Sequence, residues 1–357
     1  MSKYSQTEQQ AAITELWYTR CPVPTVSGLA LDLGWLDKTF AENAIAFRSL
    51  RVVEDRSVRE SHYDHTLKGL FREGGNIPAI WARATGKDTR VIGLTWVDEY
   101  QAILTLPDSE INQPEDLYKR KLGLPQRVES QIDFSRAMAL RGFLSALSVV
   151  GLDENDVNFV DVTAEQTDLR EPTNSIRSNF YYAEIAALLR GEVDAVYVKG
   201  APGVDLTTEH GLKVVIDLGS HPDPLVRVNN GTPRTITVNA DLVEQRPDLV
   251  AQYLACLFQT SRWAETHDQD VVRIVSQETG GGEAAVRKAY GTKLHQRLQP
   301  TLSNEWISAL KLHKDFLLKW GFIPADFDIN AWIVLEPFAQ AQKLIKESKR
   351  WEDKLLA

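Results

Sequence analysis

One cysteine of this 357-residue chain lies in a segment that favours chemistry over simple packing. Cys21 follows Arg20 and is stiffened by Pro22 and Pro24, within the sequence Tyr-Thr-Arg-Cys-Pro-Val-Pro of residues 18–24. A thiol acts as a nucleophile when a neighbouring cation or base favours its thiolate form. The alternative is a half-buried structural thiol, which needs no such rigid frame. The segment therefore predicts a functional Cys21.

A second candidate is an arginine followed by paired glycines. Residues 72–78 read Arg-Glu-Gly-Gly-Asn-Ile-Pro. A guanidinium is always charged and binds two oxygens of a sulfinate, sulfonate or carboxylate through paired hydrogen bonds. Gly74 and Gly75 would let backbone N–H groups approach the same anion. The pattern predicts substrate binding by these residues. The alternative for Arg72 is a surface ion pair with a nearby carboxylate.

Five further polar residues are candidates for the same site. His62 and His65 are possible general bases, and their alternative is a solvated loop position. Arg127 and Ser130 lie in the loop before an expected helix, whose N-terminus attracts anions. Lys199 follows an expected strand, and ligands of open α/β sheets bind outside the carboxyl ends of strands. We therefore predict that Arg127, Ser130 and Lys199 contribute to an anion site.

The composition excludes several other classes of protein. The net charge of −9 argues against the concentrated basic face that duplex nucleic acid or an acidic membrane requires. No apolar run approaches the roughly 18 residues of a membrane helix. Because residues 1–10 are polar, we expect a cytoplasmic protein without an export signal. No Cys-x-x-Cys, His-Glu-x-x-His or calcium-loop pattern predicts a metal site. Cys256 lies in an apolar helical segment and is expected to be structural.

The apolar pattern alternates between short strand-like runs and helical runs, which is typical of α/β domains with parallel sheets. Expected strands cover residues 13–18, 45–53, 90–96, 101–106, 121–124, 157–162, 194–198, 213–218 and 234–238. Expected helices cover residues 27–40 and 77–85, a long segment capped by Asp133, residues 181–190, and most of the chain beyond Pro247.

The order of these elements predicts two lobes. We expect a first lobe from residues 1–106 and 225–357, with a helical C-terminal region, and a second lobe from residues 107–224. Two phrases add to this pattern: Leu-Leu-Arg-Gly-Glu-Val-Asp-Ala-Val-Tyr at residues 188–197 and Ile-Pro-Ala-Ile at residues 77–80. The whole resembles the type II periplasmic-binding-protein fold, whose two α/β lobes close on a ligand between them. A fold of this kind supports many functions.

Several phrases spread along the chain point to one branch of that fold. Residues 18–24 match Tyr-x-x-Cys-Pro-Val-Pro, residues 34–37 read Gly-Trp-Leu-Asp, and residues 72–78 place an arginine before Gly-Gly and Ile-Pro. The phrases Val-Ile-Asp-Leu-Gly at residues 215–219 and Gln-Arg-Pro-Asp-Leu-Val at residues 245–250 also have counterparts in that branch. Together they are similar to the aryl-sulfinate desulfinases, typified by 2'-hydroxybiphenyl-2-sulfinate desulfinase.

This resemblance implies a role for three of the candidates. In those enzymes the cysteine of the opening segment is the essential catalytic residue, and the arginine and a nearby glycine help to hold the sulfinate. By motif match these roles fall to Cys21, Arg72 and Gly75. The resemblance implies no organic cofactor.

The same resemblance leaves the position of the catalytic histidine open. The family's histidine shortly precedes a Tyr-Asp pair, and anchoring on residues 63–64 places Glu60 at that position. His62 or His65 would supply the imidazole if the loop is shifted by a turn. We expect one of these two histidines to accompany the thiol.

Two hypotheses from different classes follow. The first is a desulfinase-like enzyme that cleaves the carbon–sulfur bond of a small, aromatic sulfinate and releases sulfite, with Cys21 as the central residue. The alternative is a solute-binding protein for sulfonate- or nitrate-type anions that delivers its ligand to the permease of an ABC transporter. Both predict a small organic anion as the partner. Only the first needs a thiol, and only the second needs export.

Overall fold

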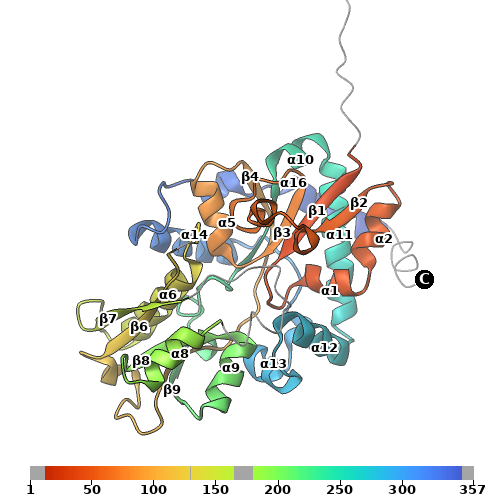
Figure 1. Cartoon of the computed structure of the whole chain (residues 1–357). Coiled ribbons are helices and arrows are strands. Elements are labelled where there is room, and N and C mark those ends of the chain that lie inside the picture. The colour runs from red at the N-terminus through yellow and green to blue at the C-terminus, as the bar shows by residue number, and fades with distance from the viewer. Residues whose placement is uncertain (1–12, 129, 165–179, 348–357) are drawn as a thin grey trace, which may run out of the picture.

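The computed structural model describes residues 13–128, 130–164 and 180–347, which form two α/β lobes (Figure 1). Residues 1–10, whose polar character led us to expect a cytoplasmic protein, lie outside the described residues. Each lobe contains a five-stranded mixed sheet, with strand order β2-β1-β3-β10-β4 in the first and β7-β6-β8-β5-β9 in the second. No helix in the described parts of the chain is long and apolar enough to cross a membrane. The expected α/β fold class is confirmed.

The first sheet has a parallel half and an antiparallel half. Its strands are β1 (Glu15–Arg20), β2 (Ala46–Ser49), β3 (Leu70–Gly74), β4 (Thr89–Thr95) and β10 (Arg234–Asn239). Strand β1 pairs in parallel with β2 and β3, whereas β10 runs antiparallel between β3 and β4. Strand β3 was not predicted from the sequence. All five of its residues are buried, which is unusual for a strand that contains Arg72 and Glu73.

The second sheet repeats this arrangement. Its strands are β5 (Gln101–Thr105), β6 (Lys121–Gln126), β7 (Asn158–Thr163), β8 (Ala195–Lys199) and β9 (Lys213–Asp217). Strand β6 pairs in parallel with β7 and β8, and β5 runs antiparallel between β8 and β9. Because β5 belongs to this sheet, the first crossing between the sheets lies between β4 and β5, before the boundary expected at residue 106. The return crossing lies between β9 and β10 and includes the other expected boundary, residue 225.

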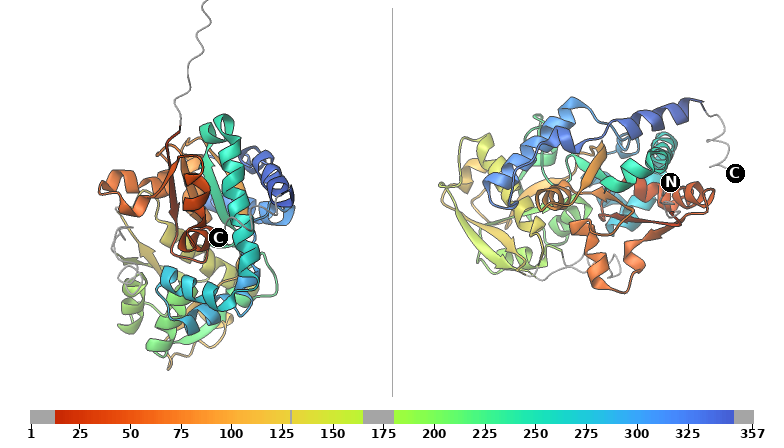
Figure 2. Two further views of the ribbon diagram at one scale, coloured as in Figure 1. Left: turned by 90° about the vertical axis from the view of Figure 1, so that its right-hand side faces the viewer. Right: turned by 90° about the horizontal axis from the view of Figure 1, so that it is seen from above.

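Helices cover the faces of both sheets (Figures 1 and 2). The α-helices are α1 (Val26–Asp32), α2 (Trp35–Ala41), α3 (Arg56–Arg59), α4 (Ser61–Asp64), α5 (Asn76–Ala84), α6 (Phe134–Val149), α8 (Tyr182–Leu189), α9 (Gly200–Glu209), α10 (Ala240–Gln245), α11 (Pro247–Ala264), α12 (Asp268–Thr279), α13 (Glu283–Tyr290), α14 (Asn304–Lys319), α15 (Ile329–Trp332) and α16 (Glu336–Glu347). Short 3₁₀ turns are η1 (Leu50–Val52), η2 (Pro114–Leu117), η3 (Leu218–Ser220) and η4 (Leu294–Gln296).

Local sequence explains where several helices begin and end. The helix expected at residues 27–40 is two helices, because Gly34 adopts a left-handed conformation with φ of 70° and ends the first of them. Helix α6 begins after Asp133, whose carboxylate accepts a hydrogen bond from the backbone N–H of Arg136 at 3.0 Å, as the sequence predicted. This cap fixes the start of α6 at the edge of the interlobe cleft.

The helical C-terminal region connects both lobes. Helix α11 buries a broad apolar face that includes Cys256, which is fully buried. Burial raises the pKa of this thiol to about 12, so it stays protonated at neutral pH. Helix α13 reaches the second lobe, where the Tyr290 hydroxyl accepts a hydrogen bond from the N–H of Ala201 at 3.4 Å. The C-terminal region therefore packs against elements of both sheets.

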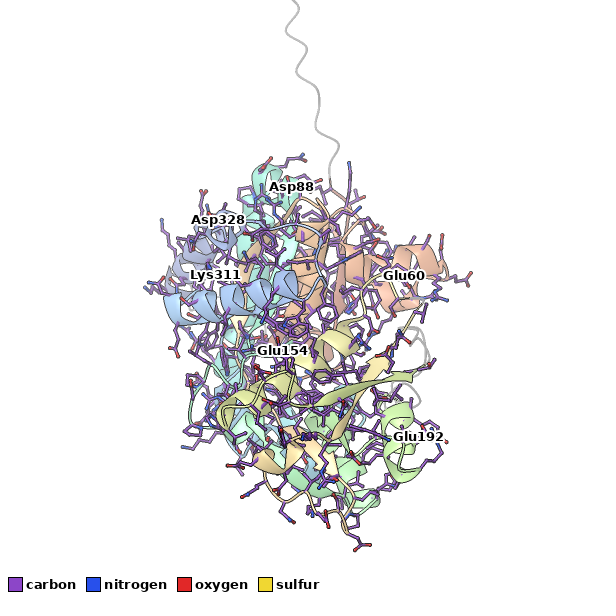
Figure 3. All side chains as sticks on the ribbon, turned by 90° about the vertical axis from the view of Figure 1, so that its left-hand side faces the viewer. Glu60, Asp88, Glu154, Glu192, Lys311 and Asp328 are labelled. Carbon is purple, nitrogen blue, oxygen red and sulfur yellow. The ribbon has the colours of Figure 1, made fainter. Side chains whose placement is uncertain are left out.

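The charged surface is separate from the interior. Labelled side chains such as Asp88, Glu192 and Lys311 point outward over the surface, as Figure 3 shows, and each is more than half exposed. Surface ion pairs of this kind contribute little to stability. The buried charged residues described below lie around the cleft instead.

Candidate active site between the lobes

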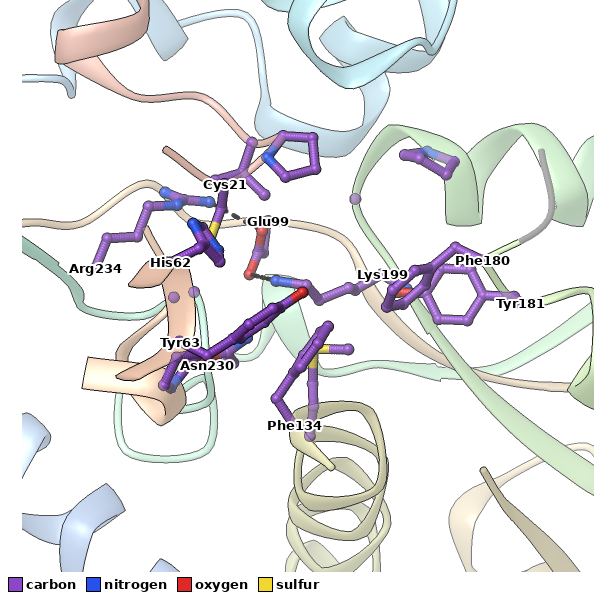
Figure 4. A pocket seen from close by; sticks show the side chains of 18 of the residues that line it. Cys21, His62, Tyr63, Glu99, Phe134, Phe180, Tyr181, Lys199, Asn230 and Arg234 are labelled. Atoms are coloured by element: carbon purple, nitrogen blue, oxygen red, sulfur yellow. Dashed lines mark hydrogen bonds and ion pairs between the residues drawn. The ribbon is translucent and has the colours of Figure 1, made fainter. Parts of the chain in front are cut away.

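A pocket lies between the two lobes and contains about 1090 Å³ of empty space. Its wall is mostly apolar, with a small number of charged and polar groups, as expected for a small-molecule site. Figure 4 shows the labelled side chains converging on this space from both lobes. The residues that line it are Cys21, Pro22, Val23, Arg51, His62, Tyr63, Gly75, Pro78, Glu99, Phe134, Met138, Phe180, Tyr181, Lys199, Gly200, Pro202, Asn230, Gly231, Arg234 and Tyr290.

The thiol of Cys21 lies in the pocket wall directly after strand β1. The backbone N–H of Cys21 donates to the carbonyl of Glu73 at 3.1 Å, which extends the pairing of β1 with β3 by one residue. Gly74 provides room for the sulfur: a Cβ atom there would lie 2.3 Å from Cys21 Sγ. Gly74 does not line the pocket and is better described as the residue that admits the thiol.

His62 is the imidazole that accompanies this thiol. Its Nε2 lies 3.6 Å from Cys21 Sγ, and its Nδ1 lies 2.8 Å from the hydroxyl of Thr19. Burial lowers the pKa of His62 well below its usual value, and the nearby guanidinium of Arg72 adds to this effect. The imidazole is therefore neutral at pH 7. A neutral ring that donates from Nδ1 to Thr19 presents Nε2 to the thiol as a proton acceptor.

The guanidinium of Arg72 lies behind the thiol. Its Nη2 is 3.7 Å from Cys21 Sγ, while Nε donates to the carbonyl of His62 at 2.8 Å and Nη1 to that of Gly75 at 3.0 Å. The side chain is fully buried, so the surface ion pair considered from the sequence is wrong. Arg72 thus ties the thiol, the histidine backbone and the glycine into one rigid unit.

Gly75 lies where the first lobe meets the return crossing. A Cβ atom at Gly75 would lie 2.4 Å from Asn230 Oδ1, so only glycine permits this approach. Asn230 accepts hydrogen bonds from the first two N–H groups of α5. Its backbone carbonyl accepts from Asn76 N at 2.8 Å, and its side-chain Oδ1 accepts from Ile77 N at 2.9 Å. The N-terminus of α5 is therefore occupied by the backbone carbonyl and the side chain of Asn230.

The N-terminus of α1 is occupied in a similar way. The buried carboxyl group of Glu73 accepts hydrogen bonds from Ser27 N at 2.8 Å and Val26 N at 3.4 Å. Burial raises the pKa of Glu73, and these hydrogen bonds to its carboxyl group act against that rise. A ligand anion cannot use the start of α1 while Glu73 fills it.

Three of the other predicted site residues, His65, Arg127 and Ser130, lie outside the main pocket. His65 is buried behind Arg72 and bonds to the hydroxyl of Thr237 at 3.1 Å, and burial lowers its pKa to about 3. Arg127 and Ser130 line a smaller pocket beside the main one. Arg127 donates to the carbonyl of Phe180 at 2.9 Å and covers that ring at 4.9 Å. The structure therefore brings Cys21, His62, Arg72 and the two glycines together, and leaves the other three apart from the thiol.

Glu60 does not approach the thiol. Its carboxylate pairs with Arg56 one helical turn away at 3.5 Å, and Figure 3 shows it at the side of the first lobe. The alignment on the Tyr-Asp pair placed Glu60 where a histidine was expected. The imidazole beside the thiol is instead that of His62, two residues further along the chain.

Lys199 does line the main pocket, at the carboxyl end of β8, and it belongs to a charged cluster that the sequence did not reveal. Its Nζ lies 2.7 Å from Glu99 Oε1, and Arg234 Nη2 lies 3.0 Å from Glu99 Oε2. Burial alone would raise the pKa of Glu99, but the charges of Lys199 and Arg234 hold it below its usual value. Glu99 is therefore ionised.

Arg51 is another pocket residue that the sequence did not reveal. It lies in the short turn η1 and remains partly exposed to the pocket. Glu278 of α12 accepts hydrogen bonds from Arg51 Nη2 at 2.9 Å and from Arg20 Nη2 at 2.6 Å. Arg20, the residue before Cys21, therefore pairs with α12 through Glu278.

Aromatic rings form the wall of the pocket on the side of the second lobe, together with one ring from the first lobe. Tyr63 of the first lobe stacks on Phe134 of α6, with ring centroids 6.1 Å apart, and Phe134 stacks on Phe180 at the same distance. Such walls favour a flat apolar ligand, since aromatic pairs add to the energy of burial.

No protein-family model and no curated protein sequence matches this chain. Solved structures do match. A cysteine-to-serine mutant of DszB in complex with biphenyl-2-sulfinic acid is 23% identical, with a TM-score of 0.72 over 92% of this chain and 99% of that one. The periplasmic aliphatic sulphonate binding protein SsuA from Escherichia coli is 17% identical, with a TM-score of 0.64 over 90% and 92%. These matches confirm the type II periplasmic-binding-protein-like fold.

Proposed function

We propose that this protein is a desulfinase-like enzyme that cleaves the carbon–sulfur bond of a small aromatic sulfinate. In the overall reaction the sulfinate and one water give the arene and hydrogensulfite. The observation that supports this proposal is the contact of the Cys21 thiol with a neutral imidazole and a buried guanidinium in the wall of an interlobe pocket. A protein that only binds an anion has no need of this arrangement. We further propose a cytoplasmic location.

Two routes through Cys21 are consistent with this geometry. In one, His62 accepts the thiol proton, the thiolate attacks the sulfinate sulfur, and the departing carbon takes the proton back; water then releases hydrogensulfite from the cysteine-bound sulfur. In the other, the thiol protonates the ring carbon, sulfur dioxide leaves, and water converts it to hydrogensulfite while the thiolate regains its proton. His62 serves both routes because its free nitrogen faces Sγ.

The sulfinate oxygens need positive partners near the thiol. The family resemblance assigns this role to Arg72 and Gly75. Arg72 lies behind Sγ with its nitrogens directed at protein atoms, whereas Arg51 lines the pocket itself. We propose that Arg51 contacts the oxygens directly and that Arg72 holds the thiol and the Gly75 carbonyl in place. Exclusion of water by the apolar wall would strengthen these interactions.

The second candidate function is a solute-binding protein for a sulfonate- or nitrate-type anion that serves an ABC permease, and would then be periplasmic. It is favoured by the likeness to the sulphonate binding protein SsuA and by the cationic residues in the pocket. This function does not use the thiol–imidazole contact.

The test measures sulfite release by the purified protein from a panel of aryl and alkyl sulfinates, beside the Cys21→Ser variant. We expect sulfite from at least one aryl sulfinate and none from the variant. Absence of sulfite from every member of the panel, together with tight sulfonate binding that Cys21→Ser retains, would instead establish the binding protein. Sulfite release that survives in Cys21→Ser would remove the cysteine from the mechanism.

A further inference from the structure

The pocket contains a second charged centre that the proposed chemistry does not use. Lys199, Glu99 and Arg234 meet in its wall, with Lys199 coming from the second lobe and Arg234 from the first sheet. Glu99 is the only carboxylate among the described residues that line the pocket. Two cations therefore share one anion, and the cluster keeps a net charge of about +1.

Arg234 has unused hydrogen-bonding capacity. Its side chain is fully buried, and only Nη2 meets the carboxylate of Glu99. Its Nε and Nη1 have no hydrogen-bond partner among the described residues. A buried guanidinium with unpaired N–H groups is costly, so such groups are normally satisfied by protein, water or a ligand. Arg234 is one of the residues that line the pocket, so its unpaired N–H groups lie directly behind the wall, next to the partly exposed Lys199.

The cluster and the thiol contact different glycines of the wall. The sulfur of Cys21 is packed against Gly74, and Asn230 is packed against Gly75. The cluster lies at Gly231, where a Cβ atom would be 1.9 Å from Glu99 Oε1 and 3.0 Å from Lys199 Nζ. The thiol centre at Gly74 and Gly75 and the Lys199–Glu99 cluster at Gly231 are therefore separate polar centres. Asn230 and Gly231, which are consecutive in the chain, connect them.

We propose that Lys199, supported from behind by the buried charge of Arg234, forms a second subsite for an anionic oxygen substituent of the ligand, such as a carboxylate on the aromatic ring. The preferred ligand would then carry two anionic groups, one at Cys21 and one at this cluster. A single sulfinate satisfies the first centre and leaves the surplus positive charge of the second without a partner. The choice of a sulfinate for the first group rests on the proposed function, whereas the subsite itself is a statement about binding.

Binding of unreactive analogues tests the subsite. Isothermal titration calorimetry on the full chain would compare benzenesulfonate with 3- and 4-sulfobenzoate, which add one carboxylate to the same ring. We expect the better of the two sulfobenzoates to bind at least about tenfold more tightly, equivalent to about 1.4 kcal/mol. Lys199→Met should remove most of this advantage while affinity for benzenesulfonate changes much less. Lys199→Arg should retain it, since it preserves the charge.

Lys311→Met is the matched control, because Lys311 pairs with Asp315 on the exposed face of α14 and does not line the pocket. Circular dichroism melts would verify that each variant is folded, and the comparison of ligands on the unmodified protein needs no variant. Equal affinity for all three ligands would overturn the proposal. So would an equal loss for mono- and dianions in Lys199→Met, which would indicate one shared anion site. A clear dianion preference without sulfite release would retain the subsite and reject the desulfinase.

Discussion

The two walls of the interlobe pocket hold their polar groups in different ways. On the first-lobe wall, Cys21, His62 and Arg72 are tied to one another and to the backbone of that lobe. On the second-lobe wall, aromatic rings dominate, and Lys199 makes its ion pair with Glu99 from the segment between the sheets. The first arrangement fixes reacting groups in one geometry, as catalysis requires. The second presents ring faces on which a flat ligand can stack. We infer that the reacting groups come from the first lobe, and that the second-lobe wall contributes to recognition together with Arg51, Tyr63 and Arg234 of the first lobe.

The largest expected effect is the loss of turnover in Cys21→Ser. A hydroxyl is a poorer nucleophile and a weaker acid than a thiol, so sulfite release should fall by at least about a thousandfold. Affinity for an aryl sulfonate, measured by calorimetry, should change by less than about threefold. Cys256→Ala is the control, since that thiol is fully buried in α11 and should leave turnover almost unchanged. A parallel loss of binding and turnover in Cys21→Ser would contradict the separation of the two walls.

The next effect is expected at His62. His62→Gln removes the proton acceptor beside Sγ and should lower kcat by about 10²- to 10⁴-fold, with a smaller change in KM. His65→Gln is the comparison, because His65 bonds to Thr237 and does not line the pocket. Steady-state sulfite assays would give both parameters. If His65→Gln lowers kcat as much as His62→Gln does, the assignment of the imidazole is wrong.

A third effect is steric. Gly74→Ala places a Cβ atom 2.3 Å from Cys21 Sγ, so the thiol or strand β3 must shift. Overpacking of this kind costs about 1–3 kcal/mol of unfolding free energy. We expect urea denaturation to show this loss and sulfite release to fall as well, because the sulfur leaves its position beside His62. Gly282→Ala is the control, since a Cβ there meets no atom within 4 Å. An active, fully stable Gly74→Ala variant would show that the thiol is not confined.

A fourth effect concerns pH. Burial lowers the pKa of His65 to about 3, whereas in the unfolded chain it is close to 6.5. Between these two pKa values the unfolded state binds a proton on His65 and the folded state does not. The unfolding free energy therefore falls as pH decreases below about 6.5, by up to about 1.4 kcal/mol per pH unit from this residue.

The measurement is the unfolding free energy in urea at pH 7.5, 6.0 and 5.0 for the unmodified protein and for His65→Gln. The buried carboxyl of Glu184, whose pKa is raised to about 7, has the opposite dependence, so the difference between the two proteins is the quantity to compare. The variant should lose less stability on acidification. Parallel curves would show that His65 is not held neutral by burial.

The smallest effect is expected on the recognition wall. Phe134→Leu keeps an apolar side chain but removes stacking with Tyr63 and Phe180, which should weaken aryl sulfonate binding by about 0.5–1.5 kcal/mol. Binding of a short alkyl sulfonate serves as the control and should change less. Calorimetry on both ligands gives the comparison, and an equal loss for the two would assign Phe134 to packing alone.

Much of the fold could be predicted because most elements carry a clear periodicity. The alternation of strand and helix segments indicated two α/β lobes, and Asp133 marked the start of α6 correctly. Strand β3 was missed because it is buried on both faces yet contains Arg72 and Glu73. Charged residues normally indicate a loop or an exposed face. Here both are satisfied by remote partners, the carbonyl of His62 and the N–H of Ser27, which a local pattern cannot reveal.

The sequence by itself determined the α/β character of this protein and the identity of the stiffened cysteine, since both depend on residues close together in the chain. The tertiary structure alone decided which imidazole faces that thiol and which charges surround the pocket. Glu99 meets Lys199 across 100 residues and Arg234 across 135. The energies of buried charges depend on such distant partners, and only the folded chain specifies them.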